Sequence, residues 1–220
     1  MIREVISFLG KDRFINAKFL NTLSVLEYAG ARKIIKSQKA ESLNLEILRH
    51  IAEEIRHARI LKKMALQLSN QSLTTYRKEH LLAGDAAWDY IQSVDHFVED
   101  EIKKPDPWIK YLYVTLLIEE RAMEVYPLYS ETLGQLGLAQ PLQGLIAEEE
   151  THLKFTQRHI LENDPESSKR LPQLRAFEKS QFDKFMISAH LELAILNNKD
   201  GRQHHASPNE LERSGNVLIK

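Results

Sequence analysis

The chain has 220 residues, a formal net charge of -1, 8 Gly, 7 Pro and no Cys. This length suits one well-filled core rather than two clear domains, and the charge provides no global basic field for nucleic acid. The lack of Cys excludes disulfides, thiolate metal sites and iron–sulfur clusters carried on this chain. No stretch approaches the roughly 18 apolar residues of a membrane span, and the apolar run at the start is too short for a signal peptide. We therefore expect a cytoplasmic protein.

The first half of the chain shows helical periodicity interrupted by polar stretches. A first helix is predicted over residues 12–37, where an apolar stripe that includes Leu20, Leu23 and Ile34 surrounds Glu27. A second is predicted over 43–68 and carries Glu54 and His57 on its apolar face. The polar residues 69–72 interrupt the pattern, and a third amphipathic helix is predicted over 81–102.

The second half continues in the same way. Pro105 and Pro107 separate the third helix from a fourth over residues 107–133, because proline is tolerated in the first turn of a helix but not inside it. This fourth helix carries Glu119, and a fifth over 141–161 carries Glu149 and His152. After a polar loop at 163–168, an aromatic-rich helix is predicted over 171–196. Because no strand-like alternation is present, the predicted fold class is all-α, with one helical domain over 1–196 and a polar tail over 197–220.

The most informative pattern is a repeated string. Residues 51–57 and residues 146–152 both read Ile-Ala-Glu-Glu-x-x-His. Each copy contains a Glu-x-x-His pair, and residues three apart on a helix lie about 60° apart around its axis. A carboxylate and an imidazole therefore leave the same face one turn apart, which suits two ligands of one metal ion. A repeated pair indicates two ions.

The repeat extends to the preceding helices. Glu27 precedes Glu54 by 27 residues, and Glu119 precedes Glu149 by 30 residues. Each half of the chain thus predicts a helix with a central Glu, a turn, and a helix with Glu-x-x-His. Two such antiparallel pairs would bring all six side chains to one level of a four-helix bundle, with residues 69–104 as a long crossover containing an extra helix.

Metal binding would offset the cost of burying these groups. Four carboxylates and two imidazoles in one apolar layer are very unfavourable without compensation, and two divalent cations would neutralise the four negative charges. Hard carboxylates with imidazoles suit Fe(II) or Mn(II), and Zn(II) also accepts such ligands. We therefore expect two iron ions, with manganese as the alternative.

Over roughly residues 12–162 the chain resembles the ferritin-like di-iron carboxylate superfamily, in which two helices each supply a Glu and two each supply a Glu-x-x-His pair. The resemblance implies that Glu54 and Glu149 bridge the metals and that His57 and His152 each cap one of them. By the same resemblance, Glu27 and Glu119 are the outer ligands. No catalytic residue is implied beyond these metal ligands.

Several neighbouring residues allow two interpretations. Glu120 is adjacent to Glu119, but the smaller and more apolar neighbours of Glu119 favour it as the ligand. Glu53 and Glu148 lie about 100° around the helix from the ligands, which favours solvated side chains or carboxylates that support a ligand. His50 and His159 could support the site, but inward-facing histidines without a chemical role are the favoured interpretation. Tyr126 could hydrogen-bond a ligand, but core packing explains it as well, and His204 and His205 are interpreted as incidental.

Within the superfamily, residues 117–126 and 53–57 look most like bacterial tRNA hydroxylases, which use O2 to oxidise an isopentenyl-type modification on adenosine. This resemblance implies a monooxygenase or hydroxylase acting on a modified tRNA nucleoside. One alternative is a di-iron oxygenase that acts on a fatty aldehyde or another apolar small molecule. The other is an iron-handling protein for ferroxidation, storage or peroxide removal. Because the chain has no Cys and no flavin-binding motif, an oxygenase would need an external electron donor.

Overall fold

The computed structural model describes residues 1–102 and 106–203, and every regular element within them is helical. The helices are α1 (Ile2–Leu9), α2 (Arg13–Ser37), α3 (Leu45–Leu68), α4 (Gly84–Ile102), α5 (Pro107–Gly134), α6 (Ala139–Asn163) and α7 (Ser167–Gln203), with short 3-10 turns at Ala40–Ser42 and Lys78–His80. The all-α prediction is confirmed for this part of the chain. None of the helices described here combines the length and apolarity needed to cross a membrane.

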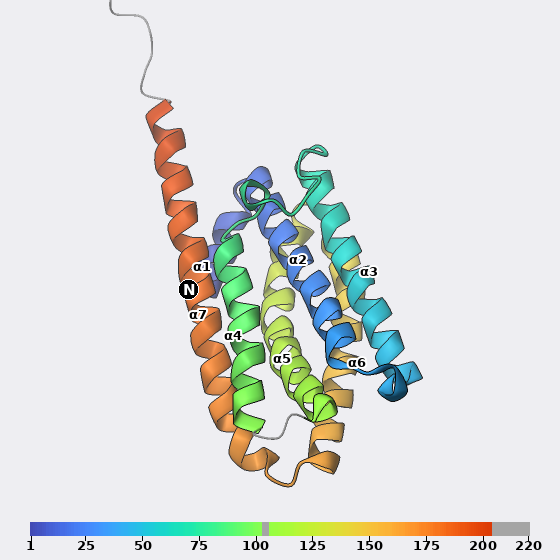
Figure 1. Cartoon of the computed structure of the whole chain (residues 1–220). Helices are drawn as coiled ribbons and strands as arrows, with labels where there is room; N and C mark the ends of the chain where they lie inside the picture. The colour runs from blue at the N-terminus through green and yellow to red at the C-terminus, as the bar shows by residue number, and fades with distance from the viewer. Residues whose placement is uncertain (103–105, 204–220) are drawn as a thin grey trace, which may run out of the picture.

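The helices pack as three antiparallel pairs (Figure 1). Helix α2 lies along α3, and α5 lies along α6, so the two halves of the sequence repeat form the two pairs that face each other. Helix α4, in the long connection between these pairs, packs mainly against α7. Together α4 and α7 lie beside α2 and α5 and cover one side of the four repeat-bearing helices.

Short polar residues determine where three of the long helices begin. The Asp12 side chain accepts hydrogen bonds from the backbone N–H groups of Phe14 and Ile15 at the start of α2. Asn44 caps α3 through the N–H of Ile47, and Asp106 caps α5 one residue before Pro107. Each cap satisfies a donor that the first helical turn leaves unpaired, so these starts lie close to the predicted ones.

Other boundaries differ from the prediction. Helix α1 was not predicted, although its buried face of Val5, Ile6 and Leu9 has helical spacing. Helix α4 begins at Gly84 rather than at residue 81, because Ala83 adopts a positive φ of 52° that ends the preceding turn. Helices α6 and α7 begin earlier than predicted, and α7 continues past residue 196 to Gln203. Residues 204–220, with His204 and His205, lie outside the described residues, as does Pro105.

An aromatic and ionic cluster attaches α7 to the rest of the molecule. The ring of Phe185 in α7 stacks on Phe19 in α2, with 6.5 Å between their centroids. The buried carboxylate of Glu178 in α7 accepts hydrogen bonds of 2.9 and 2.7 Å from Arg121 in α5. It also accepts a hydrogen bond of 2.7 Å from the Tyr90 hydroxyl in α4. These contacts join α7 to α2, α4 and α5.

Candidate metal centre

The six predicted ligands come together between the two repeat-bearing helix pairs. Together with His50, they form two groups in which the possible donor atoms lie within 4.8 Å of one another. The first donor group consists of Glu27, Glu54, His57 and Glu149, and the second consists of His50, Glu119 and His152. All of these side chains are buried except Glu27, which is half-buried. Buried His and Glu groups of this kind could hold metal ions.

Three inward-facing atoms have no hydrogen-bond partner. They are Nδ1 of His57, Nδ1 of His152 and Oε1 of Glu119, and all three are shielded from solvent. His57 Nδ1 lies 2.9 Å from Glu149 Oε1, but the two atoms are not aligned for a hydrogen bond. Buried polar atoms are nearly always paired, so unpaired nitrogen and oxygen atoms within the two donor groups need an explanation. Metal ions at the two donor groups would supply the missing partners, so the residues fit such ions.

The outer nitrogens of the two histidines are held by carboxylates from the opposite helix pair. His57 Nε2 lies 2.7 Å from Glu148 Oε2, and His152 Nε2 lies 2.6 Å from Glu53 Oε2. Arg56 in turn donates two hydrogen bonds to the carboxylate of Glu148. The residue before each central Glu therefore orients the histidine of the other repeat, as carboxylates do behind metal-bound histidines. Of the two interpretations of Glu53 and Glu148, the structure supports the one in which they support a ligand.

Glu119 and Glu120 are adjacent in the sequence, but their side chains lie in different environments. Glu119 is 3 % exposed and faces the second donor group. Glu120 points to α7, where it accepts hydrogen bonds of 2.8 and 2.6 Å from Arg175. The structure therefore places Glu119, and not Glu120, at the centre, as its apolar neighbours predicted.

His50 is the residue that sequence reasoning undervalued. Its Nε2 lies 3.1 Å from Glu54 Oε1 and 3.4 Å from Glu119 Oε1. Its Nδ1 lies 2.7 Å from the hydroxyl of Tyr111, and its ring centroid is 4.1 Å from that of His152. The available signal was its spacing, because His50 lies two helical turns before His57 on the same face.

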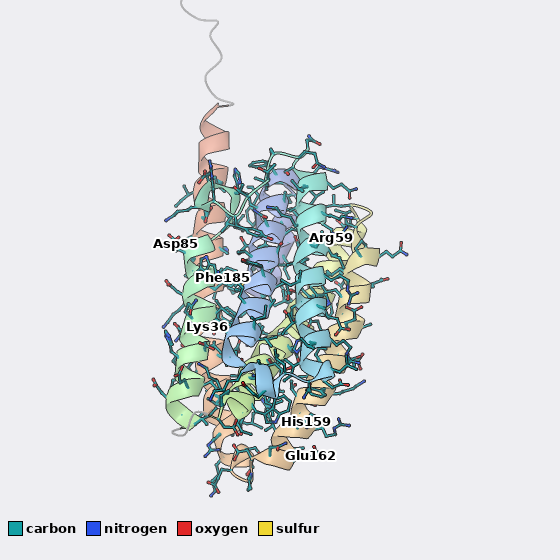
Figure 2. The ribbon with its side chains drawn as sticks, turned by 45° about the vertical axis from the view of Figure 1, so that its right-hand side comes forward. Lys36, Arg59, Asp85, His159, Glu162 and Phe185 are labelled. Atoms are coloured by element: carbon teal, nitrogen blue, oxygen red, sulfur yellow. The ribbon has the colours of Figure 1, made fainter. Side chains whose placement is uncertain are left out.

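The other residues that the sequence singled out lie in different surroundings. The Tyr126 hydroxyl donates a short hydrogen bond to Glu27, so it contacts a member of the first donor group directly. His159 does not reach the centre: its ring lies 4.3 Å from that of Phe155 and 5.6 Å from that of Trp108. Figure 2 shows His159 and Glu162 together near the lower end of α6. The packing interpretation of His159 is therefore the one that the structure supports.

Burial makes several of these carboxyl groups hold their protons. It raises the pKa of Glu54 to about 7, and the neighbouring Glu149 adds to the rise. Burial and neighbouring carboxylates hold the pKa values of Glu27 and Glu119 well above their usual range. Burial also lowers the pKa of His50 to about 3, and His152 adds to that effect. A cation entering this centre would therefore displace protons.

Glu149 and His57 behave as an ion pair. Burial alone would raise the pKa of Glu149, but the imidazoles of His152 and His57 outweigh it and lower this pKa to about 2. Burial alone would lower the pKa of His57, but Glu149 outweighs it and raises this pKa to about 10. The carboxyl and imidazole groups of the centre therefore already hold protons, which a metal ion bound to the same atoms would replace.

Two pockets adjoin at the carboxylate side of the centre. The first spans about 510 Å³ between α2, α3, α4 and α5, part of it open to solvent, and its lining includes His50 and Tyr111. The second spans about 690 Å³, also partly open to solvent, and its walls are mainly apolar side chains from α2, α4, α5 and α7. Both are lined by Gly30, Glu54, Ile91, Ile118 and Glu119. His57 and His152 line neither pocket, so the pockets reach the donor groups through their carboxylates and His50.

Comparisons with protein-family models, with curated proteins and with solved structures found no match for this chain. Its function therefore has to be inferred from the chemistry of the donor groups and of the pockets beside them.

Proposed function

We propose that this chain is a non-haem di-iron oxygenase of the ferritin-like type, in which the two donor groups hold two iron ions. The observation that carries the proposal is the convergence of inward-facing atoms without partners, from His57, His152 and Glu119, on buried carboxylates. Four carboxylates balance the charge of two divalent cations, and a donor set of carboxylate and imidazole without thiolate suits Fe(II) or Mn(II). Glu54 and Glu149 would bridge, because each lies within 4 Å of a histidine of the second donor group.

Bound iron would supply the redox chemistry that activates O2 towards a substrate C–H bond. The chain's own residues orient that centre and shield it. Glu148 and Glu53 hold the histidine rings, and the Tyr126 hydroxyl holds Glu27 in place. The apolar walls of the second pocket exclude water from the reacting side, which protects a reactive oxidant from side reactions.

The pockets favour an apolar small molecule as the substrate. The second pocket is lined by apolar side chains such as Leu26, Ala122 and Phe182 together with carboxylates of the donor groups. A pocket with apolar walls and a few convergent polar groups is typical of small-molecule sites. A chain or ring system bound there would have its C–H bonds beside the centre, in the position that an oxygenase requires.

The charges at the first pocket do not favour tRNA. A tRNA substrate needs a contiguous basic face. Lys33 and Lys110 line this pocket, but both are paired with Asp95, at 3.1 and 3.4 Å, and Lys110 also pairs with Glu99. We therefore favour an apolar small molecule over a modified tRNA as the substrate. Oxidation of a modified tRNA and iron handling stay predictions from sequence resemblance.

An oxygenase of this kind needs electrons from outside the chain. The sequence has no Cys for an iron–sulfur cluster and no recognisable flavin-binding motif. A separate reductase or a small electron carrier would therefore be the partner. The structure places no further demand on its identity.

Metal analysis of the purified protein tests the proposal. After anaerobic loading with Fe(II) and removal of excess metal, the wild-type chain should retain about two ions, and Glu54→Ala should retain fewer because it removes a shared ligand. Glu120→Ala is the matched control, since Glu120 is adjacent to a ligand but pairs with Arg175 instead. Retention of no iron by the wild type, or full occupancy in Glu54→Ala, would show that the proposal is wrong.

A further inference from the structure

The two donor groups differ in composition although they come from a repeated pair of helices. The first contains three carboxylates and one imidazole, whereas the second contains one carboxylate and two imidazoles. If Glu54 and Glu149 are shared between the groups, the remaining difference is one additional imidazole in the second, which belongs to His50. The first donor group is therefore rich in oxygen donors and the second is relatively rich in nitrogen donors.

His50 has no counterpart in the other half of the chain. It lies seven residues before His57 in α3, and the position seven residues before His152 in α6 is Leu145. Leu145 is 1 % exposed and belongs to the hydrophobic core, so it offers no donor atom. The twofold relationship that brings the six repeated residues together is broken at this position.

His50 is held in the same manner as the two repeated histidines. It is 4 % exposed, and its Nδ1 is anchored at 2.7 Å by the hydroxyl of Tyr111. Its other nitrogen consequently faces Glu54 and Glu119. His57 and His152 likewise have one nitrogen anchored by a side chain and the other directed inward. The second donor group also contains two of the unpaired buried atoms, His152 Nδ1 and Glu119 Oε1.

We propose that His50 is a seventh metal donor, and that it makes the two metal sites unequal in affinity and in metal preference. This inference rests on the proposed metal centre and adds to it. Nitrogen donors discriminate among divalent metals, in the order Mn(II) below Fe(II) below Co(II), more strongly than hard carboxylates do. The nitrogen-rich second donor group should therefore select the later metal, and the oxygen-rich first donor group should be the one that accepts Mn(II).

Competitive loading with Mn(II) and Co(II) tests this inference without any enzyme assay. The metal-free protein is incubated anaerobically with equal amounts of both ions. Metal content is then measured, together with the Co(II) absorption bands and the electron paramagnetic resonance signal of Mn(II). The wild type should hold about one ion of each metal, with the absorption bands expected of Co(II) bound to nitrogen. In a titration with Co(II) alone, two binding events should differ in affinity by about tenfold or more.

Variants of His50 and of its partner Tyr111 test whether His50 makes the two binding events unequal. His50→Ala should weaken the Co(II)-selective event by about tenfold or more while the other event keeps its affinity. Tyr111→Phe retains the ring but removes the hydroxyl that anchors His50, so it should weaken the same event to a smaller extent. His159→Ala is the control, because this histidine lies outside both donor groups, and it should bind as the wild type does.

Two equivalent binding events in the wild type, or two unchanged events in both His50→Ala and Tyr111→Phe, would overturn the inference and leave the proposed di-metal centre intact. A wild-type protein that binds no ion would overturn both. If His50→Ala fails to fold by circular dichroism, Tyr111→Phe decides the question on the same criterion.

Discussion

Glu53 and Glu148 each orient a histidine that belongs to the other half of the repeat. Their contacts with His152 and His57 are short, at 2.6 and 2.7 Å, and each fixes which ring nitrogen faces the centre. Replacement of Glu148 by Gln keeps the size of the side chain but removes its charge. We expect Glu148→Gln to lower metal affinity about 10- to 100-fold, as loss of a carboxylate behind a histidine ligand typically does. Competition with a chromophoric chelator measures this loss.

The adjacent Glu150 provides the control for that experiment. It is exposed and pairs with Lys154 on the outer face of α6. Glu150→Gln should leave metal affinity unchanged. If the two variants bound metal equally well, the support that we assign to Glu148 would be disproved.

Metal binding should release protons near neutral pH. Glu54 has a pKa raised to about 7, and the pKa values of Glu27 and Glu119 are also raised, so these groups hold protons in the metal-free protein. A cation must displace those protons, and its apparent affinity therefore increases as the pH rises through 7. The apparent affinity should continue to increase at higher pH, because His57, with a pKa raised to about 10, must also lose a proton before it binds a metal ion.

Calorimetry can count the released protons. Titrations of Fe(II) or Mn(II) at about pH 6, in two buffers with different ionisation enthalpies, should give different apparent heats because binding releases protons to the buffer. Glu54→Gln should release fewer protons than the wild type. Equal heats in both buffers, or an affinity that does not change with pH, would contradict the assigned protonation states.

At the scale of helices, the sequence predicted the long elements well and the short or strained ones poorly. The apolar periodicity identified α2, α3 and α5 because it is a local signal, and the caps Asp12, Asn44 and Asp106 seen in the structure are local as well. Helix α1 was missed because it has only eight residues, and its stability comes from packing against α5 and α7. The start of α4 was predicted too early because the positive φ of Ala83 is set by tertiary contacts, among them a hydrogen bond of 2.7 Å from its N–H to Glu192 in α7.

One buried ion pair contributes to the attachment of α7. Glu178 is 4 % exposed and is the shared acceptor for Arg121 and Tyr90. Glu178→Ala would leave the Arg121 cation without its buried partner, and we expect it to destabilise the fold by about 3 kcal/mol. Glu120→Ala breaks the more exposed pair with Arg175 and should cost at most about 1 kcal/mol. Urea denaturation compares the two, and equal losses would show that Glu178 does not anchor α7.

Across the entire chain, the repeat explains six of the seven side chains in the two donor groups and does not explain the pockets. Similar spacing in two helix pairs placed the six predicted residues together, because a twofold arrangement needs only local geometry to repeat. His50 could not be weighed from spacing alone, since its relevance depends on contacts with Glu119 in another helix. The second pocket could not be predicted from the sequence either, because its walls come from segments as distant as α2 and α7.

The lining of the second pocket indicates a substitution that should block substrate binding. Ala122 lines this pocket on α5, and Ala122→Phe should fill part of the space beside Glu119. Decanal is a suitable apolar probe, and we expect its binding to the metal-loaded protein to fall about tenfold or more in this variant, because the added ring occupies the apolar volume. Metal content should not change. If Ala122→Phe bound decanal as tightly as the wild type, the substrate would have to bind elsewhere, and a modified tRNA fragment would be the next probe.

Anomalous X-ray diffraction at the iron absorption edge, from crystals of the iron-loaded protein, would locate the ions themselves. We expect two anomalous peaks, one among Glu27, Glu54, His57 and Glu149 and the other among His50, Glu119 and His152. Crystals of iron-loaded protein without a peak between these side chains would contradict the proposed metal centre, as would iron bound only at surface carboxylates.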